Sequence, residues 1–83
     1  MASALILINC DFPFIEDIVN DLHKISETEY AHRVDGTYQI IAKINSKTEQ
    51  ELHNVLKNKI SKIEKIINIL TLIIYKKTIR MKT

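Results

Sequence analysis

TEYAHRVDGTYQIIAKI, residues 28–44, contains two runs in which successive side chains alternate between the two faces of a strand, joined by Asp35-Gly36. A period of two is typical of β-strands with one buried face. The Asp-Gly pair holds the one glycine of the chain. It predicts a type I′ turn, because both central residues of that turn need positive φ. We therefore expect a β-hairpin with a two-residue turn at Asp35-Gly36.

The segment before this hairpin predicts a strand followed by a helix. Residues 4–10 form a short, β-branched apolar run that is typical of a buried strand. Residues 13–25 then place apolar side chains at helical spacing on one face. Pro13 stands in the first turn, where a helix tolerates proline, and Asp11 is a candidate cap.

The segment after the hairpin repeats the pattern with a helix followed by a strand. Ser46 with Glu49 and Thr48 with Glu51 form two overlapping capping boxes. A stripe of apolar residues at helical spacing extends from there to residue 63. Residues 66–75 are apolar on both faces and predict a last strand.

The predicted order is β-α-β-β-α-β, the ferredoxin-like α+β fold with a four-stranded antiparallel sheet and two helices on one face. The apolar stripe of the second helix repeats that of the first at a constant interval, as Phe14 with Leu52 and Ile25 with Ile63 illustrate. The sheet face without helices carries large aliphatic side chains, and exposed apolar patches of this kind are rare on monomers. We therefore expect a homodimer whose sheets face each other, a dimeric α/β arrangement.

The composition is that of one small folded domain. The chain has 83 residues, of which 46% are hydrophobic and 27% charged, with one glycine and one proline. No apolar run reaches the roughly 18 residues that a membrane span needs, so we expect no membrane partner. A single cysteine excludes an internal disulfide and fits the reducing cytoplasm.

The net charge of +2 hides an uneven distribution. Residues 1–54 carry four basic and nine acidic side chains, whereas residues 55–83 carry eight basic and one acidic. Such blocks occur in nucleic-acid or membrane contacts, in solvated surfaces and in complementary patches that guide self-association. Residues 76–83 hold four of the positive charges, and we interpret them as a solvated tail.

Catalytic and metal-binding patterns are weak in this sequence. His23, His32 and His53 have no metal-ligand spacing, and we interpret them as surface or half-buried residues. Cys10 next to a histidine would be a nucleophile, but beside an apolar run a cysteine is more often a small buried hydrophobe. We therefore expect no enzyme activity, no cofactor and no metal. The alternative of a small dimeric ferredoxin-like enzyme would need Cys10 and His32 in hydrogen-bond reach.

Two further patterns have plainer interpretations. Asp17 and Asp21 lie one helical turn apart, on what we take as a solvated helix face. Tyr30 and Tyr38 are aromatic residues on predicted strands, as in sheets that stack RNA bases. The Gly-aromatic cluster that such sheets carry is absent from this sequence.

Four stretches together resemble the effector-binding domain of the Lrp/AsnC transcription regulators, also called the RAM domain. They are ISET (25–28), VDGTYQI (34–40), IEKI (63–66) and TLII (71–74). The resemblance extends from Ala4 to Tyr75 and implies the same β-α-β-β-α-β fold. It also implies transcription regulation, with an amino acid bound at interfaces between dimers by groups around the hairpin.

Carried over position by position, the resemblance implies a ligand-binding site at this hairpin. Gln39 stands where the family usually has Asp, and Glu64-Lys65 stands where Pro-Gly is common. An ammonium group prefers a charged carboxylate, so the Gln39 position predicts a weakened, altered or lost ligand preference. The implied site residues are Val34, Asp35, Gly36, Thr37, Tyr38 and Gln39, with Thr71 as a further candidate.

The resemblance also sets the expected domains and partners. We expect a single RAM-like domain over residues 1–77 and a basic C-terminal tail over residues 78–83. Full-length family members carry a helix-turn-helix, and only three residues precede the first strand, so we expect a stand-alone effector domain without direct DNA binding. The expected partners are a second copy, higher oligomers of dimers, an amino-acid-like effector and full-length Lrp-type regulators. The alternative is a structural or adaptor oligomerisation domain without a ligand.

Overall fold

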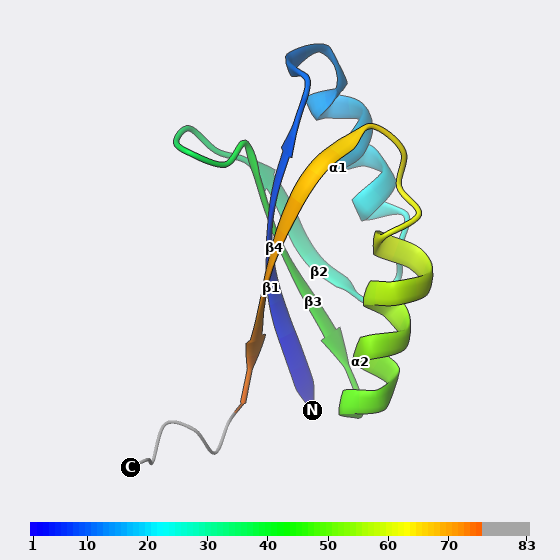
Figure 1. Ribbon diagram of the computed structural model, residues 1–83. Helices are drawn as coiled ribbons and strands as arrows, with labels where there is room; N and C mark the ends of the chain where they lie inside the picture. Colours follow the sequence, from blue (N-terminus) through cyan, green and yellow to red (C-terminus); the bar gives the residue numbers. More distant parts are fainter. Residues whose placement is uncertain (76–83) are drawn as a thin grey trace.

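The computed structural model of the chain describes residues 1–75, so the expected basic tail at residues 78–83 lies outside the described residues. The elements in order are β1 (Ala2–Cys10), the 3₁₀ turn η1 (Phe12–Phe14), α1 (Ile15–His23), β2 (Thr28–Arg33), β3 (Ile40–Ser46), α2 (Glu49–Val55), the π-helical turn η2 (Leu56–Ile60) and β4 (Ile66–Ile74). Within residues 1–75 the strands form one antiparallel sheet, ordered β2-β3-β1-β4, with both helices on one side (Figure 1). The expected ferredoxin-like fold class is confirmed.

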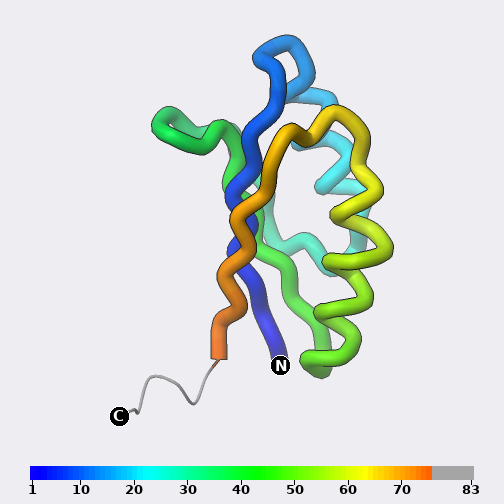
Figure 2. The backbone as a smooth tube through the Cα atoms, viewed as in Figure 1, coloured from blue at the N-terminus to red at the C-terminus, as the bar shows by residue number. Residues whose placement is uncertain are grey.

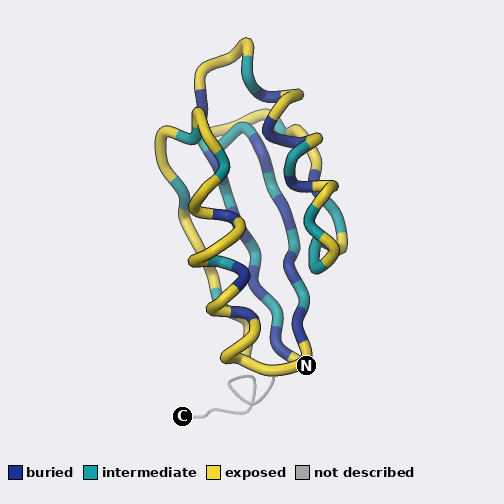
Figure 3. The backbone as a smooth tube through the Cα atoms, turned by 90° about the vertical axis from the view of Figure 1, so that its right-hand side faces the viewer, coloured by how far each residue is buried: buried dark blue, intermediate teal, exposed yellow. Residues whose placement is uncertain are grey.

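The hydrophobic core lies between the sheet and the helices. Along β1, every second residue from Ala2 to Cys10 is buried, and the residues between them are half-buried on the other face. α1 contributes Ile15, Ile18, Val19 and Leu22 to this core, and α2 with η2 contributes Leu52, Val55 and Ile60. Figure 3 looks onto the helix layer, where buried residues face the sheet and exposed residues face outward.

Both helices are shorter than the sequence predicts. Phe12–Phe14, with Pro13, form a 3₁₀ turn before α1, and the side chain of Asp11 makes no cap hydrogen bond. At the second helix the Thr48 cap is confirmed, because Thr48 Oγ1 accepts the backbone N–H of Glu51 at 3.1 Å. The Ser46 box is wrong, since Ser46 belongs to β3 and its hydroxyl is buried without a partner among the described residues. The helix ends as a π-type turn in which Ser61 N–H donates to the carbonyl of Leu56 at 3.1 Å.

The hairpin is present, but the predicted type I′ turn is wrong. Ladder pairing ends at Arg33 opposite Ile40, so residues 34–39 form a longer loop. Gly36 has φ of 149°, and among the described residues Lys65 is the one non-glycine residue with positive φ, so Asp35 does not adopt the turn geometry. The physical reason is that Gln39 bonds on both sides of β3: its carbonyl accepts the N–H of Val34 at 2.8 Å, and its own N–H donates to the carbonyl of Ile8 at 3.0 Å. The chain therefore reverses over residues 35–38, and Asp35-Gly36 is not a two-residue turn.

The turn before β4 has an unusual backbone. Lys65 has φ of 76°, in the left-handed region that favours glycine. Its ammonium nitrogen lies 4.4 Å from the centre of the Phe14 ring. The Glu64-Lys65 pair, which departs from the Pro-Gly of the resembled family, therefore still makes a turn that normally uses glycine.

Among residues 1–75, no helix is long and apolar enough to cross a membrane.

Candidate functional site

The loop of residues 34–39, the hairpin loop, projects from one end of the sheet on the side away from the helices. Figures 1 and 2 show it in green, with the helices on the opposite side of the sheet. Its base is closed by the backbone N–H of Val34, which donates to the carbonyl of Gln39 at 2.8 Å. The hairpin loop therefore presents its backbone and side chains outside the layer formed by the sheet.

Gln39 ties the hairpin loop to the end of β1 through two hydrogen bonds. Its backbone N–H donates to the carbonyl of Ile8 at 3.0 Å. Its side-chain oxygen Oε1 accepts the backbone N–H of Cys10 at 2.7 Å. A register shift interrupts the β1–β4 ladder between Asn9 and Cys10, so the Gln39 side chain supports the strand where its pairing is irregular.

The structure brings six of the seven predicted site residues together, because they are consecutive in one loop. Val34, Tyr38 and Gln39 are half-buried, and the three residues between Val34 and Tyr38 are exposed. Thr71 is not brought to them. It lies on the edge strand β4 opposite Ile6, on the face of the sheet that the helices cover.

A depression of about 330 Å³ lies at the start of the hairpin loop and is lined by Arg33, Val34 and Asp35. The Arg33 guanidinium carbon lies 5.0 Å from the centre of the Phe12 ring, and Nη1 lies 3.9 Å from a carboxylate oxygen of Glu16. Arg33 is absent from the residues predicted by sequence. Its position just before the hairpin loop was visible in the sequence, but its contact with Phe12 was not.

The depression combines three kinds of group within one short segment. Arg33 supplies a cation with planar donors, Asp35 a carboxylate, and Val34 an aliphatic wall. A guanidinium binds a carboxylate through paired hydrogen bonds, and a carboxylate accepts an ammonium group. Groups of these two charges are the kind that bind the two ends of a molecule that carries both an ammonium and a carboxylate.

The other chemistry-bearing residues do not assemble into a site. His23 Nε2 lies 3.1 Å from the carbonyl of Ala31, and His32 stacks on Tyr30 with ring centres 5.3 Å apart. Cys10 is buried in the core, while His32 lies on the other face of the sheet, opposite half-buried Ile41. Burial, with a smaller effect of the Asp11 charge, raises the pKa of the Cys10 thiol, which disfavours the reactive thiolate. Among the described residues, no group of three potential metal ligands occurs.

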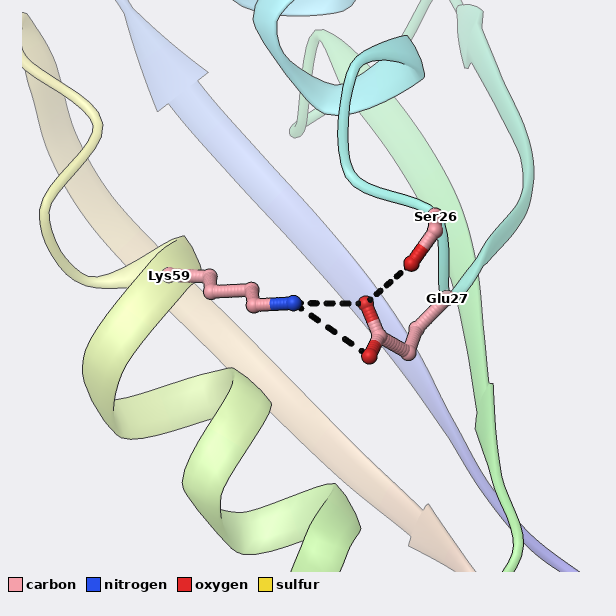
Figure 4. Close-up of polar contacts among 3 residues, drawn as sticks. All are labelled: Ser26, Glu27 and Lys59. Atoms are coloured by element: carbon pink, nitrogen blue, oxygen red, sulfur yellow. Dashed lines mark hydrogen bonds and ion pairs between the residues drawn. The ribbon is translucent and has the colours of Figure 1, made fainter.

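At the opposite end of β2, a polar cluster joins the sheet to the second helix (Figure 4). Lys59 Nζ donates to both carboxylate oxygens of Glu27, at 3.0 and 3.3 Å, and Ser26 Oγ donates to one of them. The hydrogen bond from Lys59 is the main cause that lowers the pKa of Glu27. The backbone carbonyl of Glu27 also accepts the N–H of Asn45, so this cluster has a structural role.

The sheet face away from the helices, the bare face, is apolar over β1 and β4. Leu5 and Leu7 of β1 are half-buried there. Their ladder partners on β4, Leu72 and Leu70, are 46% and 40% exposed. Around β2 and β3 the same face is polar, since Lys43 and Asn45 both contact the carboxylate of Glu29.

Solved structures with this fold include several of similar size. FFRP-DM1 is 27% identical with a TM-score of 0.85, and the match covers 90% of this chain and all of that one. A hypothetical protein from Pyrococcus horikoshii is 25% identical with a TM-score of 0.85, over 99% of this chain and all of that one. AsnC from E. coli is 26% identical with a TM-score of 0.81; the match covers 99% of this chain but 55% of AsnC.

Among proteins with curated functions, no sequence gives a significant match. The family profile described as the Lrp/AsnC ligand binding domain matches residues 3–83, nearly the whole sequence. The resemblance inferred from the hairpin is thereby confirmed, and the chain belongs to the Lrp/AsnC ligand-binding domain family.

Proposed function

We propose that this chain is a non-enzymatic regulatory module that self-associates and binds a small amino-acid-like effector beside the hairpin loop. One observation carries the proposal: Arg33, Val34 and Asp35 line a single depression at the loop where the family resemblance expects the ligand. Membership of a ligand-binding family of transcription regulators supports it.

The two charged groups suit the two ends of an amino acid. Asp35 is exposed and can accept hydrogen bonds from an ammonium group, while Arg33 can donate to a carboxylate. Gln39 brings no charge, and its Oε1 already bonds to Cys10 N–H. In this proposal the carboxylate of Asp35 therefore takes the place of the Asp that the family usually carries at position 39.

The depression is open, so a second subunit is needed to enclose a ligand. The bare face supplies the contact for a homodimer, since Leu70 and Leu72 are large apolar side chains left exposed beside Leu5 and Leu7. Burial of apolar surface contributes about 25 cal/mol per Å², before the costs of association. Such dimers would assemble further, with the effector between subunits.

The module would act in the cytoplasm by shifting the balance between assemblies. An effector favours whichever assembly it binds more tightly. The chain would assemble with itself, and co-assembly with full-length Lrp/AsnC regulators would transmit the effector signal to them without DNA contacts from this domain.

Thermal melting of the chain with each of the common amino acids tests the proposal. A ligand present at about 100 times its dissociation constant adds about 2.7 kcal/mol to the free energy of unfolding. We expect at least one amino acid to raise the melting temperature, and Asp35→Asn to remove the effect. Glu64→Gln, an exposed carboxylate in the turn before β4, is the matched control. No shift with any amino acid would refute effector binding.

A ligand-free adaptor domain is the second candidate function, and one observation favours it. The Gln39 side chain holds β1 through Cys10 N–H and so serves the fold at the position that binds ligand in the resembled family. Gln39→Glu adds a charge at the same side-chain length, whereas Gln39→Asp adds the charge on a shorter side chain. If neither variant nor the wild type binds an amino acid, the adaptor function is supported.

A further inference from the structure

The helix layer carries an acidic row and a basic row of side chains. α1 holds three carboxylates and no lysine or arginine, a net charge of −3. Residues 56–65, which are η2 and the turns after it, hold four lysines and one glutamate, a net charge of +3. We call Glu16, Asp17 and Asp21 the acidic stripe and Lys57, Lys59, Lys62 and Lys65 the basic stripe.

The two stripes lie side by side at the same end of the sheet. β1 ends at Cys10, which pairs with Ile66, the first residue of β4. α1 therefore begins where the segment of η2 ends, and the two run in opposite directions on the layer seen in Figure 3. A depression between them, of about 310 Å³, is lined from one side by Asp17 and Asp21 and from the other by Glu64 and Lys65.

Few of these charges are neutralised within the chain. Lys59 is held by Glu27 at 3.0 Å, but Glu16 and Asp21 have cation partners only at 3.9 and 3.8 Å, outside hydrogen-bond distance. Within residues 1–75, Asp17, Lys57 and Lys62 are exposed and form no ion pair within 4.0 Å. The stripes therefore remain available to a partner.

We propose that the helix layer is a self-association surface, on which two copies pack about a two-fold axis parallel to α1. That rotation places the acidic stripe of each copy on the basic stripe of the other. The same contact therefore forms twice, and the two copies make a closed, symmetric pair. A polyanion such as nucleic acid fits less well, because its phosphates on the basic stripe would meet the carboxylates of α1 alongside.

This surface is separate from the bare face and does not depend on an effector. Contacts between exposed charges weaken as salt shortens the Debye length, from about 30 Å at 0.01 M to about 3 Å at 1 M. An apolar contact across the bare face does not weaken in this way. A salt dependence of the mass that charge reversal in the stripes removes therefore reports the helix-layer contact.

Sedimentation velocity of the full chain and two charge-reversed variants tests this surface. Lys57→Glu/Lys62→Glu changes the net charge of residues 56–65 from +3 to −1, and Asp17→Lys/Asp21→Lys changes that of α1 from −3 to +1. We expect each variant alone to lose the salt-sensitive species, with the dissociation constant raised at least about tenfold, or about 1.4 kcal/mol. Lys47→Glu reverses an exposed lysine outside the stripes and should leave the association unchanged.

Mixing the two variants gives the decisive comparison, since α1 and residues 56–65 are both net negative in one variant and both net positive in the other, so opposite charges meet at both contacts. We expect the salt-sensitive species to return in the mixture. A wild-type mass that is the same in low and high salt would overturn the proposal. A mixture of the two variants that stays dissociated would also overturn it. The same holds if the charge-reversed variants still form the salt-sensitive species. Circular dichroism of each variant checks that the fold is retained.

Discussion

The side-chain oxygen Oε1 of Gln39 accepts the backbone N–H of Cys10 at 2.7 Å, which joins the hairpin loop to the end of the central strand β1. This bond lies between residues distant in sequence. It connects the candidate site to the core, because Cys10 is buried with the residues packed beneath α1. The shape of the hairpin loop therefore depends on a contact outside the loop.

Loss of this bond should destabilise the chain. Gln39→Ala leaves the N–H of Cys10 without its protein acceptor, and an unpaired buried donor costs about 1–3 kcal/mol. We expect a decrease of that size in the free energy of unfolding, measured with urea. Gln50→Ala changes an exposed glutamine of α2 and should have little effect. Equal stabilities of the two variants would show that the bond contributes nothing.

The positive φ of Lys65 predicts that glycine at this position gives a more stable protein than alanine does. Both Lys65→Gly and Lys65→Ala remove the contact with Phe14, so they differ only in backbone freedom. At φ of 76° we expect the glycine variant to be more stable by about 1 kcal/mol. At Lys62, whose φ is not positive, the order should reverse, because glycine has more conformational entropy to lose. The same order at both positions would contradict the backbone argument.

The Glu27–Lys59 pair predicts that the stability of the fold decreases slightly at acidic pH. Because the folded-state pKa of Glu27 is lowered, the pair stabilises the fold above the ordinary glutamate pKa of about 4.3. That contribution is lost as the pH falls through the lower folded value. The pair is partly exposed, so we expect at most about 1 kcal/mol. Lys59→Met should flatten this part of the stability–pH curve, whereas Lys47→Met should not.

The bare face predicts a dimer that a single lysine disrupts. Leu72 is 46% exposed in the single chain, so Leu72→Lys should be tolerated by the fold while it places a charge in the proposed contact. We expect light scattering to show loss of the sheet-face dimer with an unchanged circular dichroism spectrum. Phe12→Lys changes an exposed apolar residue outside the sheet and is the control. A Leu72→Lys variant that stays dimeric would exclude this interface.

Local patterns were sufficient to predict the strands, the helices and their order. The alternation along β1 and β3 gives each strand a buried face, and the repeated stripe places both helices on one layer. The same patterns misjudged the hairpin turn, because the bonds from Gln39 to Ile8 and Cys10 join segments far apart in sequence. A prediction from neighbouring residues in the sequence cannot find contacts of this kind.

The candidate site, like the fold, was predicted from the sequence only in part. Six of the predicted site residues lie together because they are consecutive in the sequence. Any prediction of the hairpin would place them in the same loop. The separation of Thr71 from the hairpin loop could not be predicted, because β4 is apolar on both faces and its sequence does not show which side chains face the helices. Arg33 was overlooked because its position over Phe12 depends on how η1 packs beside β2.

The central claim is that an effector binds beside the hairpin loop and changes how the subunits assemble. Sedimentation equilibrium with and without the amino acid that most raises the melting temperature tests it directly. The account predicts a shift in mass distribution with that amino acid, and no shift in the Asp35→Asn variant. A mass distribution unchanged by every amino acid, in a chain that otherwise folds and self-associates, would contradict it.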